Sequence, residues 1–147
     1  MDGNHHNGQG VCPGTYTQGK KVATATVKCL LSVSLSQLHE TDYYFCGEAN
    51  CPVVYFSGDG AQTFSVQDIR ERVFQKEPES DDVLVCYCFR YTVGDVRHQN
   101  AIQGRNPIVA AIKAEIAAGK CACDWRNPQG DCCLGNVNRL SKKRCED

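Results

Sequence analysis

The sequence predicts an α+β protein in which a small subdomain of strands and helices is joined to a second, helical subdomain. Three observations carry this prediction: strand-like runs in the first half, helical apolar spacing in the second half, and cysteines that fall into two groups. A polar, acidic segment with a proline, residues 75–82, separates the halves and predicts a linker or exposed loop. The expected organisation is a flexible N-terminus (1–10), a first subdomain (11–74), a second subdomain (83–140) and a C-terminal tail (141–147).

The first half combines strand and helix patterns. Residues 43–45 and 52–56 are short aromatic and β-branched runs, which are typical of strands. Apolar residues within 26–38 recur at the spacing of one helix face and predict a helix there. Ser65 can cap a short helix that continues to Val73.

The second half reads as helical. Thr92 can cap a helix that extends to Ile102. The Asn-Pro pair at 106–107 supplies an N-cap and a proline at the first helical position, and Gly119 is placed to end that helix. A last helix is expected over residues 133–140.

Composition bounds the function. The chain has 147 residues with 16 Lys+Arg against 17 Asp+Glu, so a broad basic face for nucleic acid is not expected. No apolar run approaches the roughly 18 residues of a membrane span. The polar start lacks the apolar region of a secretory signal, which predicts a soluble, cytoplasmic protein.

Eleven cysteines are the unusual feature of the composition. In a reducing cytoplasm a dense cysteine pattern indicates metal binding, whereas a secreted protein would use disulfides. An intramolecular disulfide scheme would leave at least one of the eleven thiols unpaired. Metal ions would also stabilise two subdomains that are each too small for a large core.

The first cysteine group predicts a zinc site. Cys46 and Cys51 flank a short loop with a glycine, and a tetrahedral zinc ion needs four such ligands. Cys12 is the expected third ligand and Cys29 the fourth, although a cysteine within a helix is often a buried structural residue. His39 is a spare imidazole donor. A site saturated by protein ligands is structural and not catalytic.

The second cysteine group predicts a [2Fe–2S] cluster, which four thiolates in two pairs would hold. Adjacent strand residues alternate in direction, so the two cysteines of C-Y-C at 86–88 can face one iron. The last ligand opens the final helix, where backbone N–H groups favour an anion. A second zinc site is the alternative, and Cys121 and Cys132 are neighbouring alternative ligands, while Cys145 stands alone. The expected cluster ligands are Cys86, Cys88, Cys123 and Cys133.

Several motifs together resemble the N-terminal domain of CopZ-type copper chaperones. They are V-C-Y-C-F at 85–89, C-A-C at 121–123 and N-P-Q-G-D-C-C-L at 127–134, with Y-Y-F-C at 43–46 and C-P-V-V-Y-F at 51–56. The second half is also similar to bacterioferritin-associated ferredoxin domains. The resemblance implies a small zinc-bound β/α subdomain joined to a helical [2Fe–2S] subdomain, in which Cys86, Cys88, Cys123 and Cys133 match the cluster ligands.

The sequence also departs from that family. Some relatives begin the zinc half with C-P-x-C, whereas here Thr15 stands where the second cysteine would be, which favours Cys29 as the substitute ligand. The M-x-C-x-x-C loop of the chaperones' separate copper-binding domain is absent, because the chain has no C-x-x-C and its one methionine is Met1. Copper transfer through that loop is therefore not expected.

The predicted function is that of a non-enzymatic, metallochaperone-like redox accessory to metal handling, with copper as the metal that the resemblance indicates. The partner would be a redox or metal-trafficking protein. A simple electron-transfer ferredoxin and an all-zinc interaction module are the alternatives. Trp125, beside the second cysteine group, is expected to be a partly buried residue that closes a small core.

Overall fold

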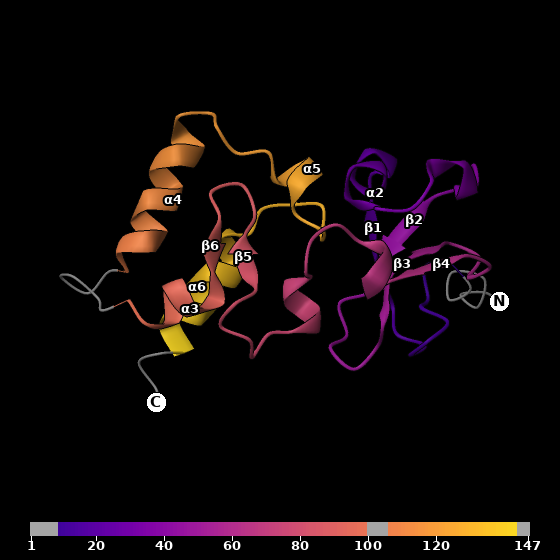
Figure 1. Ribbon diagram of the computed structural model, residues 1–147, viewed down its shortest axis with the longest axis horizontal. Coiled ribbons are helices and arrows are strands. Elements are labelled where there is room, and N and C mark those ends of the chain that lie inside the picture. Colours follow the sequence, from indigo (N-terminus) through magenta and orange to yellow (C-terminus); the bar gives the residue numbers. More distant parts are fainter. Residues whose placement is uncertain (1–8, 100–105, 144–147) are drawn as a thin grey trace.

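The computed structural model describes residues 9–99 and 106–143, so the predicted extreme termini and Ile102 lie largely outside it. The chain forms two lobes that lie side by side along the long axis of the molecule (Figure 1). A four-stranded sheet dominates the first lobe, and helices dominate the second lobe. The combination of sheet and helices agrees with the predicted α+β class.

The first lobe is an antiparallel sheet in which the strands follow their order in the chain. The strands are β1 (Lys20–Val22), β2 (Tyr43–Phe45), β3 (Val53–Ser57) and β4 (Thr63–Ser65). The predicted runs at 43–45 and 52–56 are therefore confirmed as β2 and β3. Every residue of β3 is buried, which explains its continuous apolar sequence.

The helix predicted over residues 26–38 is much shorter in the structure. Helix α2 covers Thr24–Leu30, and Leu31 is already extended and forms an isolated β-bridge with Ile69. The chain then continues to a 3-10 turn, Leu35–Gln37, that begins at Ser34, whose hydroxyl accepts a hydrogen bond from a backbone N–H. Serine side chains that bond locally to the backbone compete with a helix.

The helix predicted to run from Ser65 to Val73 is also limited to one 3-10 turn. The turn covers Val66–Asp68, and the Asp68 carboxylate accepts from the backbone N–H of Ser65 at 2.9 Å. The chain is extended again at Ile69, because this residue pairs with Leu31. The start signal was therefore correct and the length was wrong.

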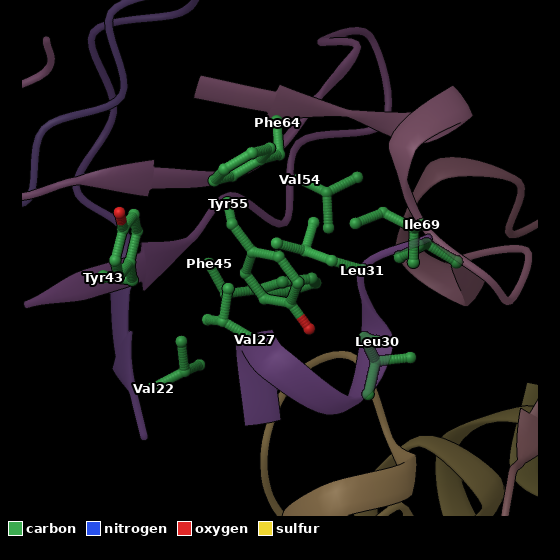
Figure 2. Packing of buried hydrophobic residues seen from close by; sticks show 11 residues of the cluster. Val22, Val27, Leu30, Leu31, Tyr43, Phe45, Val54, Tyr55, Phe64 and Ile69 are labelled. Atoms are coloured by element: carbon green, nitrogen blue, oxygen red, sulfur yellow. The ribbon is translucent and has the colours of Figure 1, made fainter. Parts of the chain in front are cut away.

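Tyr55 lies at the centre of the main core of this lobe (Figure 2). Its ring packs among aliphatic and aromatic residues from α2, β2 and β4, including Val27, Phe45 and Phe64. The ring centroids of Phe45 and Tyr55 are 6.1 Å apart at a tilted angle. A register shift in β3 between Val53 and Tyr55 places Val53 in a second cluster with the first cysteine group.

The second lobe combines a two-stranded hairpin with four helices. The hairpin pairs β5 (Leu84–Cys86) with β6 (Tyr91–Thr92). The helices are α3 (Val93–Arg97), α4 (Pro107–Ala117), α5 (Cys123–Arg126) and α6 (Leu134–Lys143). Within the described ranges, no helix is long and apolar enough to cross a membrane.

The predicted helix caps of the second lobe are confirmed. The Thr92 hydroxyl accepts from the backbone N–H of Asp95 at 3.0 Å, which begins α3. The Asn106 side chain accepts from the N–H of Ile108 at 2.8 Å, which begins α4. Gly119 follows α4 with a φ of +77°, the left-handed conformation that ends many helices.

The segment between the lobes is held by specific contacts. It contains a 3-10 turn, Phe74–Lys76, and an ion pair between Arg72 and Glu77 at 2.6 Å. The Lys76 ammonium donates to the carbonyl oxygen of Glu48 at 2.8 Å, so this segment is tied back to the first lobe. The lobes also meet where α5 packs on α2 (Figure 1). The boundaries 11–74, 75–82 and 83–140 stay a prediction.

Candidate metal centres

Three cysteines of the first lobe converge on one buried point. The sulfur atoms of Cys12, Cys46 and Cys51 all lie within 4.8 Å of one another. Cys12 opens a tight turn in which its N–H donates to the carbonyl of Thr17 at 2.9 Å. Cys46 directly follows β2, and Cys51 lies two residues before β3. The connection between β2 and β3 therefore brings Cys46 and Cys51, the pair predicted from the sequence, close to Cys12 in its turn.

The geometry of this triad fits a zinc ion. The Sγ atoms of Cys12 and Cys51 are 3.7 Å apart, and a tetrahedral zinc with bonds of about 2.3 Å places its sulfurs roughly 3.8 Å apart. Gly14 makes room for this arrangement, because a Cβ atom there would lie 2.9 Å from the Cys51 sulfur. A side chain at position 14 would displace a ligand.

Hydrogen bonds from the turn favour the ionised form of one of these thiols. Burial opposes ionisation of Cys12, but backbone N–H groups of Gly14 and Thr15 and the Thr15 hydroxyl bring its pKa below the ordinary value. The pKa of Cys51 is raised, because burial and the hydrogen bond with Cys12 outweigh the N–H of Val53. The surroundings thus favour ionisation of Cys12 and disfavour ionisation of Cys51, and a metal ion binds both thiols in their deprotonated form.

Cys29, the expected fourth ligand, lies on an exposed face of α2. Among the described residues, it is not part of the group that the structure brings together. His39 is exposed as well, and its backbone N–H donates to the Tyr43 hydroxyl at 2.9 Å. The assignment of Cys29 stays a prediction that this geometry does not support.

Thr15 lies beside the triad instead. Its hydroxyl oxygen is 3.9 Å from the Cys46 sulfur and also hydrogen-bonds to Cys12. We treated Thr15 in the sequence only as the residue that replaces a thiolate, and we missed its role as a hydrogen-bond partner. The sequence feature that indicates this role is the C-P-G-T motif at 12–15. In a tight turn, a residue three positions after Cys12 lies close to Cys12 again.

Four cysteines of the second lobe form a second group. The Sγ atoms of Cys88 and Cys123 are 3.5 Å apart, and Cys133 lies close enough to Cys86 and Cys123 to shift their pKa values. They come from the end of β5, the following turn, the first residue of α5 and the residue before α6. Cys88 lies in the turn and not on the strand, so the alternation argument for the C-Y-C pair was wrong.

The two neighbouring thiols that were left open as ligands differ from this group in burial. Cys121 and Cys132 are exposed, whereas Cys123 and Cys133 are buried. The sulfur of Cys132 accepts from the backbone N–H of Leu134 at 3.4 Å, which holds it at the start of α6. Cys145 lies outside the described residues.

The pKa values of the four thiols in the second group depend on their interactions with one another and on their burial. Hydrogen bonds from Cys133 lower the pKa of Cys86 to about 7 and that of Cys123 to about 6. The same hydrogen bonds raise the pKa of Cys133, and burial raises that of Cys88 to about 12. The N–H of Ala122 also donates to the Cys88 sulfur at 3.0 Å, as backbone groups do around iron–sulfur sites.

The second group is more spread out than the triad. No three of these four described cysteines have all their sulfurs within 4.8 Å of one another. The contacts instead link the sulfurs in the order Cys86, Cys133, Cys123, Cys88. The four sulfurs therefore form a chain of neighbours, in contrast to the compact triad of the first lobe.

Comparison with known proteins places this chain in a family. Residues 9–70 match the model of the CopZ family that is described as a zinc binding domain. The X-ray structure of the Archaeoglobus fulgidus CopZ N-terminal domain superposes with a TM-score of 0.64 and 32% sequence identity, covering 88% of this chain and 95% of that chain. The chain belongs to the CopZ zinc-binding domain family.

The CopZ family match covers the first lobe and its cysteine triad. Because the family is described as a zinc binding domain, it identifies the triad as part of a zinc site. The copper chaperone CopZ of Archaeoglobus fulgidus is 33% identical over 129 residues, which is 88% of this chain and 60% of that protein. This CopZ-family chain therefore spans about three fifths of the length of that relative.

Trp125 differs from its prediction. Its side chain is 59% exposed on α5, whereas we expected it to close a small core. The buried member of this short helix is Cys123 instead. The polar residues on both sides of the tryptophan in C-D-W-R are typical of an exposed turn of helix.

Proposed function

We propose that this CopZ-family chain is a non-enzymatic, cytoplasmic metal-handling protein with a structural zinc site and a [2Fe–2S] site. Its role is to transfer single electrons from the cluster to a metal ion that is being handled, and we propose that this metal is copper. The observation that carries the proposal is the open group of four thiols in the second lobe. The similarity of 88% of the chain to part of a copper chaperone supports the choice of metal.

Zinc would be held by Cys12, Cys46 and Cys51, which supply three of the four ligands of a tetrahedral ion. The three thiols are buried, and their connections are tight turns and strand ends, as in structural zinc sites. The ion would fasten the turn after Cys12 to the β2–β3 connection and so stabilise the first lobe.

The cluster would be held by Cys86, Cys88, Cys123 and Cys133. When bound, a [2Fe–2S] cluster supplies a one-electron centre whose potential depends on hydrogen bonds to its sulfurs and on its exposure. In this chain the N–H of Ala122 donates to the Cys88 sulfur, and this hydrogen bond would affect the potential of the bound cluster. Cys88 is half-buried while the others are buried, so the outer edge of the group lies at Cys88.

The test mixes the dithionite-reduced protein, without excess reductant and without oxygen, with one equivalent of cupric ion and a cuprous-specific indicator. We expect one cuprous ion per chain to form while the visible absorption returns and the iron stays bound. Cupric ion that remains unreduced, or that strips the iron, would contradict the role in copper handling and leave an electron-transfer ferredoxin. A protein that stays colourless after iron–sulfide reconstitution would instead be an all-zinc interaction module.

Replacing Thr15 with valine is expected to weaken zinc binding about tenfold, the lower end of the usual effect of removing a hydrogen bond to a ligand. The reason is that the hydroxyl contacts both Cys12 and Cys46. Competition with a chromophoric chelator measures the effect, and Thr15→Ser, which keeps the hydroxyl, is the control. Equal zinc affinity in the two variants would show that the hydroxyl is not used.

A further inference from the structure

We infer that the first lobe positions two of the four cluster cysteines, by holding the segment that joins them. We call residues 124–132 the bridging segment, because they run from Cys123 to Cys133. The inference rests on the proposed function, in which both cysteines bind the cluster. It assigns a positioning role to Tyr55, which lies on β3 of the opposite lobe.

The principal contact is a buried hydrogen bond between the lobes. The Tyr55 hydroxyl donates to the carbonyl oxygen of Pro128 at 2.6 Å, and the tyrosine is 0% exposed. Burial raises the pKa of this phenol, so it stays protonated and remains a donor. Thr26, which is also 0% exposed, donates to the carbonyl oxygen of Asp124. Two buried polar groups of the first lobe are therefore used to hold the backbone of the bridging segment.

Contacts at the rim add to this attachment. Lys20 forms an ion pair with Asp131, and Gln75 bonds to Gln129. The ion pair is half-exposed and contributes little. Gly130 has a φ of +82°, and a Cβ atom there would lie 3.1 Å from Val22 Cγ1, so the segment approaches β1 closely.

The bridging segment is internally ordered, which lets it pass its position on to the cysteines. The buried Asn127 side chain donates to the carbonyl of Asp131 at 3.0 Å and accepts from the N–H of Gln129 at 3.2 Å. The Gln129 amide also donates to the carbonyl of Cys132 at 3.1 Å, one residue before Cys133. A shift at Pro128 therefore displaces the entry to α6.

The molecule provides a matched control for Tyr55. Tyr43 is equally buried in the same sheet, and its hydroxyl donates to Gln62 within the first lobe. Figure 2 shows the two hydroxyls leaving the cluster in different directions. Replacing either tyrosine with phenylalanine removes one buried hydroxyl, and only Tyr55→Phe frees the bridging segment.

The experiment compares Tyr55→Phe, Tyr43→Phe and wild type after iron–sulfide reconstitution. We expect Tyr55→Phe to lose iron to a chelator about fivefold faster, the effect of one hydrogen bond, and to change the visible circular dichroism of the cluster. Tyr43→Phe is expected to keep the wild-type spectrum and rate. Equal acceleration in both variants, or none in Tyr55→Phe, would overturn the inference.

Hydrogen exchange of the metal-free proteins separates this inference from the proposed function. We expect residues 124–132 to exchange faster in Tyr55→Phe than in Tyr43→Phe. Wild-type protein that takes up no iron would contradict the proposed function, while the exchange rates still decide whether Tyr55 holds the segment. Unchanged exchange in Tyr55→Phe would overturn the inference even if the cluster is present.

Discussion

A Cys51→Ser protein is expected to lose its zinc and to unfold at a much lower temperature than wild type. Cys51 lies two residues before β3, so losing the ion loosens one of the two inner strands of the first lobe. Structural zinc contributes about 10–16 kcal/mol to small zinc domains, and removing one of three thiolates is expected to lower the free energy of unfolding by several kcal/mol. Zinc content by elemental analysis and thermal unfolding by circular dichroism measure the two effects.

Cys29→Ser is the matched control, because this cysteine lies in the same lobe but is exposed. It is expected to keep its zinc and its unfolding temperature. Loss of zinc from Cys29→Ser would make Cys29 the fourth ligand, as the sequence predicted. Full zinc retention in Cys51→Ser would show that the triad is not the zinc site.

A Cys133→Ser protein is expected to bind almost no iron and to keep its zinc. Cys133 is 1% exposed and is close enough to both Cys86 and Cys123 to shift their pKa values, so it lies between them in the group. A serine hydroxyl is a much poorer ligand for iron than a thiolate, which iron–sulfur clusters use almost without exception. Iron and zinc counts after anaerobic reconstitution measure the outcome.

Cys132→Ser is the control for this prediction, because its thiol is exposed and next to Cys133 in sequence. It is expected to bind iron as wild type does. Iron loss in Cys132→Ser with retention in Cys133→Ser would move the ligand by one residue. Zinc loss with iron retention in Cys133→Ser would mean that the two lobes have been assigned the wrong metals.

The effects of the two ligand substitutions on the other centre are expected to be unequal. Cys133→Ser leaves the first lobe intact, so its zinc stays. Cys51→Ser loosens the strand that carries Tyr55, so iron is also expected to leave faster. This difference follows from the first lobe holding the bridging segment and not the reverse.

Local sequence patterns predicted the elements whose residues determine their own conformation. The aromatic and β-branched runs of β2 and β3 and the caps at Thr92 and Asn106 are of this kind. Strand β1, with the sequence K-K-V, was missed because its extended form comes from pairing with β2. The turn of the β5–β6 hairpin was also missed. The residue with a positive φ in this turn is Arg90, at 66°, and not the glycine that usually marks such a turn in a sequence.

The length of α2 could not be predicted, because a contact distant in sequence ends it. Leu31 continues the apolar helical spacing, yet it pairs with Ile69 in an extended conformation. The apolar pattern fits both a longer helix and an extended Leu31, and only the pairing with Ile69 decides between them.

In the first lobe the cysteine pattern predicted three thiols that meet and a fourth, Cys29, that lies apart from them. The pair Cys46 and Cys51 is local, and Cys12 joins it through the turn. Cys29 was included by counting thiols and not by considering helix faces. On α2 the buried residues include Val27 and Leu30, which are three positions apart and share a face that excludes Cys29.

The contact between Tyr55 and Pro128 could not be predicted from the sequence. The two residues are 73 positions apart, and an aromatic residue in a strand run indicates only a core position. Its hydroxyl acquires a specific role because α5 packs on α2 and brings the bridging segment over the core.

The most direct test of this account is a count of zinc, iron and acid-labile sulfide in the full chain purified without oxygen, for wild type and Cys133→Ser together. We predict one zinc, two irons and two sulfides per wild-type chain, and one zinc with almost no iron in the variant. More than one zinc per wild-type chain, with no iron taken up on reconstitution, would contradict the assignment of the second lobe.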